Sequence, residues 1–153
     1  MSQDVPQIPC FFDGACPRNQ FGTKGPMKAA YVIGDVGVVR EVPDLDMPAG
    51  VVRSNNVAEY KALIFLLRNL LAREATKGIR GRYLICGDSQ LVVRQMDSEY
   101  RVTKPHLQRL HAEARELCSG LDVEFRWVPR GKNRAGLLLE DRNRTAEKAT
   151  REN

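Results

Sequence analysis

The chain has 153 residues, of which 42% are hydrophobic and 28% are charged. Its 24 lysines and arginines outnumber 19 aspartates and glutamates, so the formal net charge is +5. This composition excludes a disordered chain and a small disulfide-stapled protein. Because the length is typical of one domain, we expect a single domain over residues 1–153, with its core between about residues 8 and 140 and a polar tail at residues 141–153.

Targeting and redox signals are the next features of the sequence. Its longest apolar run, Ala62 to Leu67, is far shorter than the ~18–20 residues of a membrane span. The start, Met1 to Pro6, has neither the basic nor the apolar part of a signal peptide. We therefore expect a cytoplasmic protein without membrane contact, whose cysteines are free thiols. The cysteines are Cys10, Cys16, Cys86 and Cys118.

The first part of the chain predicts three antiparallel strands. Ile8 to Asp13 is an apolar run followed by turn-forming residues. Lys28 to Ile33 and Val36 to Val42 are rich in β-forming residues and flank a glycine-containing turn, which predicts a hairpin.

A long helix follows. Ser54 can cap its start, the helical pattern runs from Val57 to Ala75, and Gly78 can end it. Glu59 lies four residues before Leu63, on the same stripe as the leucines that should face the core. A carboxylate on that side of a helix is unusual.

The second part of the chain alternates strands and helices. The expected elements are a strand from Tyr83 to Cys86, a helix from Ser89 to Met96, a helix opened by Pro105, a strand from Val123 to Trp127 with Val123, Phe125 and Trp127 facing the core, and a last helix from about Arg134. An antiparallel hairpin followed by βαβ crossovers predicts an α/β fold with a mixed sheet and helices on its faces.

Three acids stand out by their positions. Asp13 ends the first strand, Glu59 faces inward near the start of the long helix, and Asp88 ends the fourth strand. At one edge of a sheet such carboxylates would repel each other unless a cation neutralised them. Oxygen ligands alone suit Mg²⁺ or Mn²⁺, and two such ions about 4 Å apart activate water at a phosphodiester. The alternative, that each acid caps a helix or closes a turn, stays open on pattern alone.

Several motifs carry a resemblance to a known family. They are Asp13 to Cys16 after an apolar strand, Ser54 to Leu63, Gly87 to Val92 and, more weakly, Glu99 to Val102 and Trp127 to Arg130 with Asn133 shortly after. In this order they resemble type 1 ribonuclease H, in its compact, reverse-transcriptase-like branch of bacteria and archaea. The resemblance runs from about residue 8 to residue 140. It implies a ribonuclease H-like fold with a five-stranded mixed sheet, in which parallel strands extend three antiparallel ones and helices cover both faces.

The resemblance also implies a metal-dependent endonuclease that cuts the RNA strand of an RNA/DNA hybrid to 5′-phosphate and 3′-hydroxyl ends. Asp13 would bridge two Mg²⁺ or Mn²⁺ ions. Glu59 would hold one ion and contact a ribose 2′-hydroxyl, and Asp88 would complete the site beside the attacking water. No small-molecule cofactor is implied, and we expect a monomer.

Further residues match positions at which the family contacts its substrate. Cys16, Arg18 and Asn19 would lie along the minor groove, Ser54 to Asn56 would contact both strands and a DNA phosphate, Gln90 would touch RNA, and Arg130 stands where other members have a histidine that helps the product leave. The full set is Gly14, Cys16, Arg18, Asn19, Ser54, Asn55, Asn56, Gln90 and Arg130. Turn and cap chemistry, or a solvated surface arginine, are the alternatives.

The chain departs from the family at its fourth acid. The family has Asn-x-x-Ala-Asp, whereas here Asn133 is followed by Arg-Ala-Gly-Leu-Leu-Leu-Glu. If the motif is aligned without a gap, Leu137 takes the position of the aspartate. If the chain has a one-residue deletion, Gly136 takes that position. We prefer the second alignment because it keeps the apolar pattern of the helix. Glu140 or Asn133 could replace the missing ligand, Glu147 less readily. The metal site could also be weak, with a slow or Mn²⁺-preferring enzyme.

Two other functions therefore stay open. One is a weakly active or inactive module that binds RNA/DNA hybrids; the other is a different nuclease on the same fold, such as a junction resolvase. The segment from Ser54 to Glu59 favours ribonuclease H over the second. The basic tail could add affinity for the hybrid or be only a solubilising end. Its cationic residues include Arg142, Arg144, Lys148 and Arg151.

Overall fold

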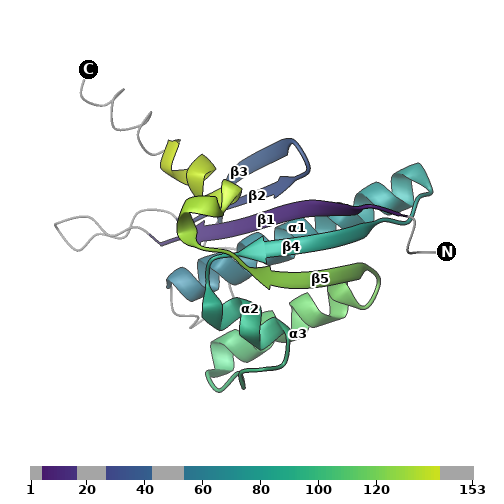
Figure 1. Cartoon of the computed structure of the whole chain (residues 1–153). Helices are drawn as coiled ribbons and strands as arrows, with labels where there is room; N and C mark the ends of the chain where they lie inside the picture. Colours follow the sequence, from purple (N-terminus) through teal and green to yellow (C-terminus); the bar gives the residue numbers. More distant parts are fainter. Residues whose placement is uncertain (1–4, 17–26, 43–53, 142–153) are drawn as a thin grey trace, which may run out of the picture.

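The fold is built on a single mixed sheet (Figure 1). The computed structural model describes residues 5–16, 27–42 and 54–141. Five strands are arranged in the order β3-β2-β1-β4-β5. They are β1 (Gln7–Ala15), β2 (Met27–Ile33), β3 (Val36–Val42), β4 (Arg82–Gly87) and β5 (Asp122–Trp127).

The strand directions match the expected topology. The β1–β2 and β2–β3 pairs are antiparallel, whereas β1–β4 and β4–β5 are parallel. The β2–β3 turn contains Gly34 at a φ of +58°, a conformation that glycine adopts readily. The predicted hairpin and its parallel extension are therefore confirmed.

Helices cover both faces of the sheet, as expected (Figure 1). On one face α1 (Asn55–Lys77) packs against β1, β2 and α3 (Pro105–Cys118), and α2 (Gln90–Met96) contacts β4 and β5. On the other face lies a helix at residues 134–141, preceded by the short 3₁₀ turn η3 (Arg130–Lys132). Within the described residues, no helix combines the length and the apolar character that crossing a membrane requires.

The ends of α1 are defined by local chemistry. The Ser54 side chain accepts a hydrogen bond from the backbone N–H of Val57, which satisfies one free donor of the first turn. Gly78 ends the helix in the left-handed conformation, and its N–H bonds to the carbonyl of Glu74. Both predicted helix signals are confirmed.

Strand β1 separates two hydrophobic clusters. Cys10 and Phe12 belong to the larger cluster, which they form with α1, α2 and α3. Phe11 packs on the smaller cluster, where Ala135 and Leu139 of the last helix meet β2. Because side chains alternate along a strand, Gly14 lies on the α1 side and Asp13 on the side of the last helix.

Gly14 brings β1 and α1 into direct backbone contact. A Cβ atom at this position would lie 2.2 Å from the carbonyl carbon of Ala58 and 2.4 Å from the backbone nitrogen of Glu59. Only glycine permits so close an approach. The contact sets the start of α1 against the end of β1.

The prediction that Trp127 faces the core is wrong. Val123 and Phe125 pack partly against the core, but Trp127 is 42% exposed. It ends β5, an edge strand, and its indole N–H donates to the Asp88 carbonyl at 3.0 Å. The ring therefore covers the end of the sheet rather than its interior.

Replacing Gly14 with alanine should lower the free energy of unfolding by about 2–3 kcal/mol, because its Cβ would collide with the α1 backbone. Urea unfolding followed by circular dichroism measures this. Gly131→Ala is the matched control, since a Cβ there meets nothing within 4 Å, and it should change stability by less than about 0.5 kcal/mol. Equal effects of the two substitutions would contradict the prediction.

Candidate active site

Three carboxylates converge where β1, α1 and β4 meet. One oxygen from each of Asp13, Glu59 and Asp88 lies within 4.8 Å of the other two. Phe11 of β1 pairs with Cys86 of β4 in parallel register. Asp13 lies two residues after Phe11 on β1, and Asp88 lies two residues after Cys86, just past the end of β4. The Gly14 contact brings Glu59 to the same point from α1. The structure thus brings together the three acids that the sequence singled out.

The environment of these acids opposes negative charge. Burial, and secondly the charge of Asp88, raise the pKa of Asp13 from 3.8 to about 7. Burial, and secondly the charge of Asp13, raise the pKa of Glu59 from 4.5 to about 8, while a hydrogen bond from Ser89 opposes the rise. The positive charge of Arg130 acts against both shifts. A bound cation would remove the repulsion and favour the ionised forms.

The acids line a cavity of about 170 Å³. Its lining contains carboxylate oxygens but, among the described residues, no thiol or imidazole, a donor set that fits Mg²⁺ or Mn²⁺. Asp13, Glu59 and Asp88 could therefore hold a divalent ion. The described lining residues are Asp13, Gly14, Ala15, Asn55, Glu59, Asp88, Arg130, Gly136, Leu139 and Glu140.

Several predicted substrate residues lie beside this cavity. A second, more open cavity of about 680 Å³ is lined by Cys16, Ser54, Asn55 and Asn56. Asn55 borders both cavities, and its side-chain oxygen accepts a hydrogen bond from the Cys16 backbone N–H at 2.9 Å. The end of β1 and the start of α1 thus form one surface next to the acids.

Other predicted residues lie away from these cavities or outside the described ranges. Gln90 is exposed at the start of α2, two residues after Asp88, and is not among the described residues that line either cavity. Arg18, Asn19, Glu147 and the basic tail lie outside the described residues.

The structure decides between the two alignments of the last motif. A Cβ atom at Gly136 would lie 3.1 Å from Oδ2 of Asp13, whereas Leu137 is 46% exposed and does not line the cavity of the three acids. Gly136 therefore occupies the position from which the family's fourth aspartate would reach the site. This placement favours the alignment with the one-residue deletion.

Asn133, one of the two candidates for the missing ligand, is engaged in the packing of the last helix. Its side chain is fully buried, its amide nitrogen donates to the Phe12 carbonyl at 3.0 Å, and its oxygen accepts from the Ala135 N–H at 3.1 Å. Asn133 therefore caps the last helix and ties it to β1. Glu140, the other candidate, does line the cavity of the acids.

Two contributors to the site were missed as such from the sequence. Ser89, expected only to start a helix, caps α2 and also hydrogen bonds to Glu59. Trp127 anchors the backbone of Asp88 through its indole N–H. The position of Ser89 directly after Asp88 is a local signal that could have indicated its role. The Trp127 contact joins residues 39 positions apart, so no local signal could have indicated it.

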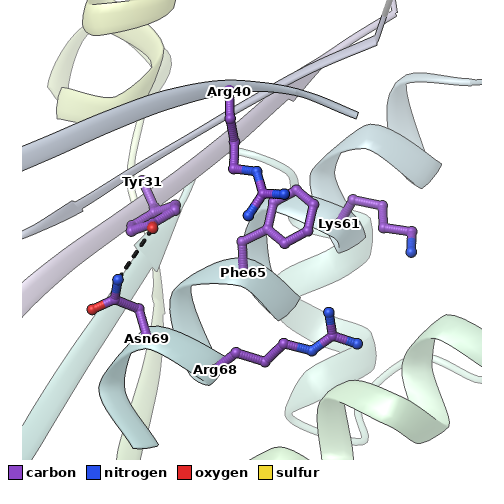
Figure 2. A pocket seen from close by; sticks show the side chains of 6 residues that line it. All are labelled: Tyr31, Arg40, Lys61, Phe65, Arg68 and Asn69. Carbon is purple, nitrogen blue, oxygen red and sulfur yellow. Dashed lines mark hydrogen bonds between the residues drawn. The ribbon is translucent and has the colours of Figure 1, made fainter. Parts of the chain in front are cut away.

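A basic cavity of about 560 Å³ lies elsewhere, between α1 and the β2–β3 hairpin (Figure 2). The Arg40 guanidinium stacks 3.9 Å from the centre of the Phe65 ring, and Asn69 donates to the Tyr31 hydroxyl at 3.3 Å. Arg68 forms an ion pair with Glu113 of α3. None of the three acids lines this cavity, and its described polar groups are engaged largely in packing α1 against its neighbours.

Comparison with known proteins agrees with the motifs. Residues 45–139 match the model of the reverse transcriptase-like family. The chain belongs to this family.

Relatives of this reverse transcriptase-like chain include ribonucleases H of type 1. It is 36% identical over 139 residues to ribonuclease HI of Halobacterium salinarum, covering 88% of this chain and 63% of that protein. It is 37% identical over 81 residues to a bifunctional protein of Mycobacterium tuberculosis, covering 52% of this chain but 21% of that protein. The chain thus spans less than two thirds of these relatives.

The fold is shared with solved structures of the same type. The crystal structure of LC11-RNase H1 in complex with an RNA/DNA hybrid matches with a TM-score of 0.68 at 27% identity, covering 84% of this chain and 89% of that one. The expected ribonuclease H-like fold is therefore confirmed.

The raised pKa values of Asp13 and Glu59 predict a pH-dependent stability without metal. An acid whose pKa is higher in the folded than in the unfolded state lowers stability as the pH rises from its unfolded to its folded pKa. Between about pH 4 and pH 8 the metal-free protein should lose stability from this cause. Asp13→Asn should therefore raise the free energy of unfolding by about 1–2 kcal/mol at pH 8, after allowance for partial solvent screening, and much less at pH 5.

Urea unfolding with EDTA at both pH values measures this difference. Asp122→Asn, at an exposed acid on β5, is the matched control and should show no such gain. An equal effect of Asp13→Asn at the two pH values would contradict the assignment.

Asn133→Ala should lower the free energy of unfolding by about 1–3 kcal/mol, because it leaves buried backbone groups of Phe12 and Ala135 without partners. Thermal unfolding measures the loss. Asn69→Ala, which removes one hydrogen bond at a partly buried site, should cost less. A neutral Asn133→Ala variant would refute the capping role.

Proposed function

We propose that the chain hydrolyses the RNA strand of RNA/DNA hybrids, using two Mg²⁺ or Mn²⁺ ions and leaving 5′-phosphate and 3′-hydroxyl ends. The observation that carries this proposal is the cluster of Asp13, Glu59 and Asp88, whose oxygens lie within 4.8 Å of one another at the end of a ribonuclease H-like sheet. Membership of the reverse transcriptase-like family and the likeness to LC11-RNase H1, solved with a hybrid, support it.

The three acids would have different roles as ligands of the two ions. After burial, the charge of Asp88 raises the pKa of Asp13, and the charges of Asp13 and, more weakly, Asp88 raise the pKa of Glu59. As the resemblance to ribonuclease H implies, Asp13 would be the shared ligand, and Glu59 and Asp88 would each complete one position. When bound, such ions supply an activated water and stabilise the leaving oxygen.

The neighbouring surface would hold the nucleic acid. Gly14, Cys16 and Ser54 to Asn56 present backbone, thiol, hydroxyl and amide groups beside the acids, which can bond to phosphates, bases and the 2′-hydroxyl that distinguishes RNA from DNA. Glu59 would also contact that hydroxyl, as the resemblance implies. Gln90, exposed after Asp88, and Arg130 would contact the strand at its edges, with Arg130 favouring a phosphate through its charge.

A second candidate function rests on one specific observation. Gly136 stands next to Asp13 where the family has an aspartate, so the metal site has one carboxylate fewer at that position. A hybrid-binding module with little or no cleavage would fit this loss. Against it, the other three acids and the neighbouring polar surface are present.

The RNA strand of a labelled hybrid should be cut in Mg²⁺ or Mn²⁺, and Asp13→Asn or Asp88→Asn should lower the rate at least about 100-fold, because several kcal/mol of charge stabilisation are lost. Gel analysis of separate metal titrations measures the rate, and end labelling identifies the 5′-phosphate. Glu113→Gln, on α3 in an ion pair with Arg68, is the matched control and should leave the rate unchanged.

The other outcomes separate the alternatives. An intact hybrid in both metals, with binding retained, would replace the nuclease by the binding module. Equal cleavage of duplex DNA or duplex RNA would indicate a different nuclease on this fold.

A further inference from the structure

We propose that Glu140 supplies the missing fourth carboxylate of the metal site, reaching from one helical turn beyond Gly136. In the structure this carboxylate lies beside Arg130. The inference rests on the proposed function only in so far as Asp13, Glu59 and Asp88 bind a divalent ion.

The first support is the orientation of the last helix. Gly136 and Glu140 are four residues apart, so they lie on the same face of the helix at residues 134–141. The 3.1 Å approach of a Cβ at Gly136 to Oδ2 of Asp13 shows that this face is turned toward the site. Helical side chains lean toward the N-terminus of their helix, which directs Glu140 back toward Gly136 and Asp13.

The second support is the space left by the glycine. Gly136 has no side chain to separate Glu140 from Asp13, and all three residues line the same cavity. The rotation of the helix is set by Ala135 and Leu139, which are buried against Ala30 and Val32 of β2. The helix therefore lies where an aspartate at residue 136 would face Asp13. In this chain the carboxylate is instead at Glu140, one turn further along the helix.

The third support is the charge around Glu140. Burial first, then the charge of Asp88 and, more weakly, that of Glu140 raise the pKa of Asp13, which places Glu140 within electrostatic reach. The Nε atom of Arg130 lies 3.9 Å from Oε1 of Glu140, and both side chains are more than half exposed. An exposed pair at this distance is weak. A divalent cation can therefore draw Glu140 away from Arg130.

The test is direct measurement of metal binding without nucleic acid. Calorimetric titration with Mn²⁺ is carried out on the wild-type protein, Glu140→Gln, and Glu140→Gln combined with Gly136→Asp. Glu140→Gln should weaken binding about tenfold or more, and Gly136→Asp should restore it, because it returns a carboxylate to the position facing Asp13. Glu99→Gln, which removes another exposed acid paired with an arginine, is the matched control and should bind like the wild type.

Unchanged Mn²⁺ affinity in Glu140→Gln would overturn the proposal, as would a double variant that folds but stays weak. Should Gly136→Asp fail to fold, Glu140→Asp tests the same point, because its shorter side chain cannot span the turn. That variant should also bind weakly, and wild-type affinity in it would refute the proposal.

The two proposals fail in different ways. Mn²⁺ binding that depends on Glu140, together with an intact hybrid, would reject the nuclease and keep the ligand assignment. Cleavage of the hybrid with the same metal dependence in the wild type and in Glu140→Gln would keep the nuclease and reject the assignment.

Discussion

The arrangement of this molecule depends on the direct contact between β1 and the start of α1. At Gly14 the strand touches the helix backbone so closely that a Cβ would lie 2.2 Å from Ala58. Neighbouring strand residues point to opposite faces. One residue, Gly14, therefore packs against α1, while the preceding residue, Asp13, turns toward the last helix. This contact brings Glu59 next to Asp13 and makes one site from two distant parts of the chain.

The contact of Gly14 with α1 also brings carboxylates close together, and the rest of the fold must hold them there against their repulsion. Burial and mutual repulsion raise the pKa values of Asp13 and Glu59 to about 7 and 8. The acids stay together because α1 is anchored along its length by buried side chains such as Leu63, Leu66 and Leu70. A large apolar core thus keeps in position a cluster that is unfavourable until a cation binds.

The position of the last helix is set by packing contacts that do not involve a side chain at residue 136. Asn133 caps this helix and ties it to β1, and Leu139 buries its inner face against β2. These contacts keep Gly136 facing Asp13 although the glycine has no ligand to offer. The packing of this helix therefore does not depend on a ligand at residue 136. A carboxylate one turn further along, that of Glu140, can face the same site.

The sequence by itself determined the elements, their order and the three acids, because apolar periodicity, helix caps and strand-terminal motifs act over a few residues. Only the tertiary structure decided which residue faces Asp13, because the choice between Gly136 and Leu137 depends on how the last helix packs on the sheet. It also decided that Asn133 ties the last helix to β1 and that Trp127 lies on an exposed edge beside Asp88. The Trp127–Asp88 and Asn133–Phe12 contacts join residues 39 and 121 positions apart, and no local pattern encodes them.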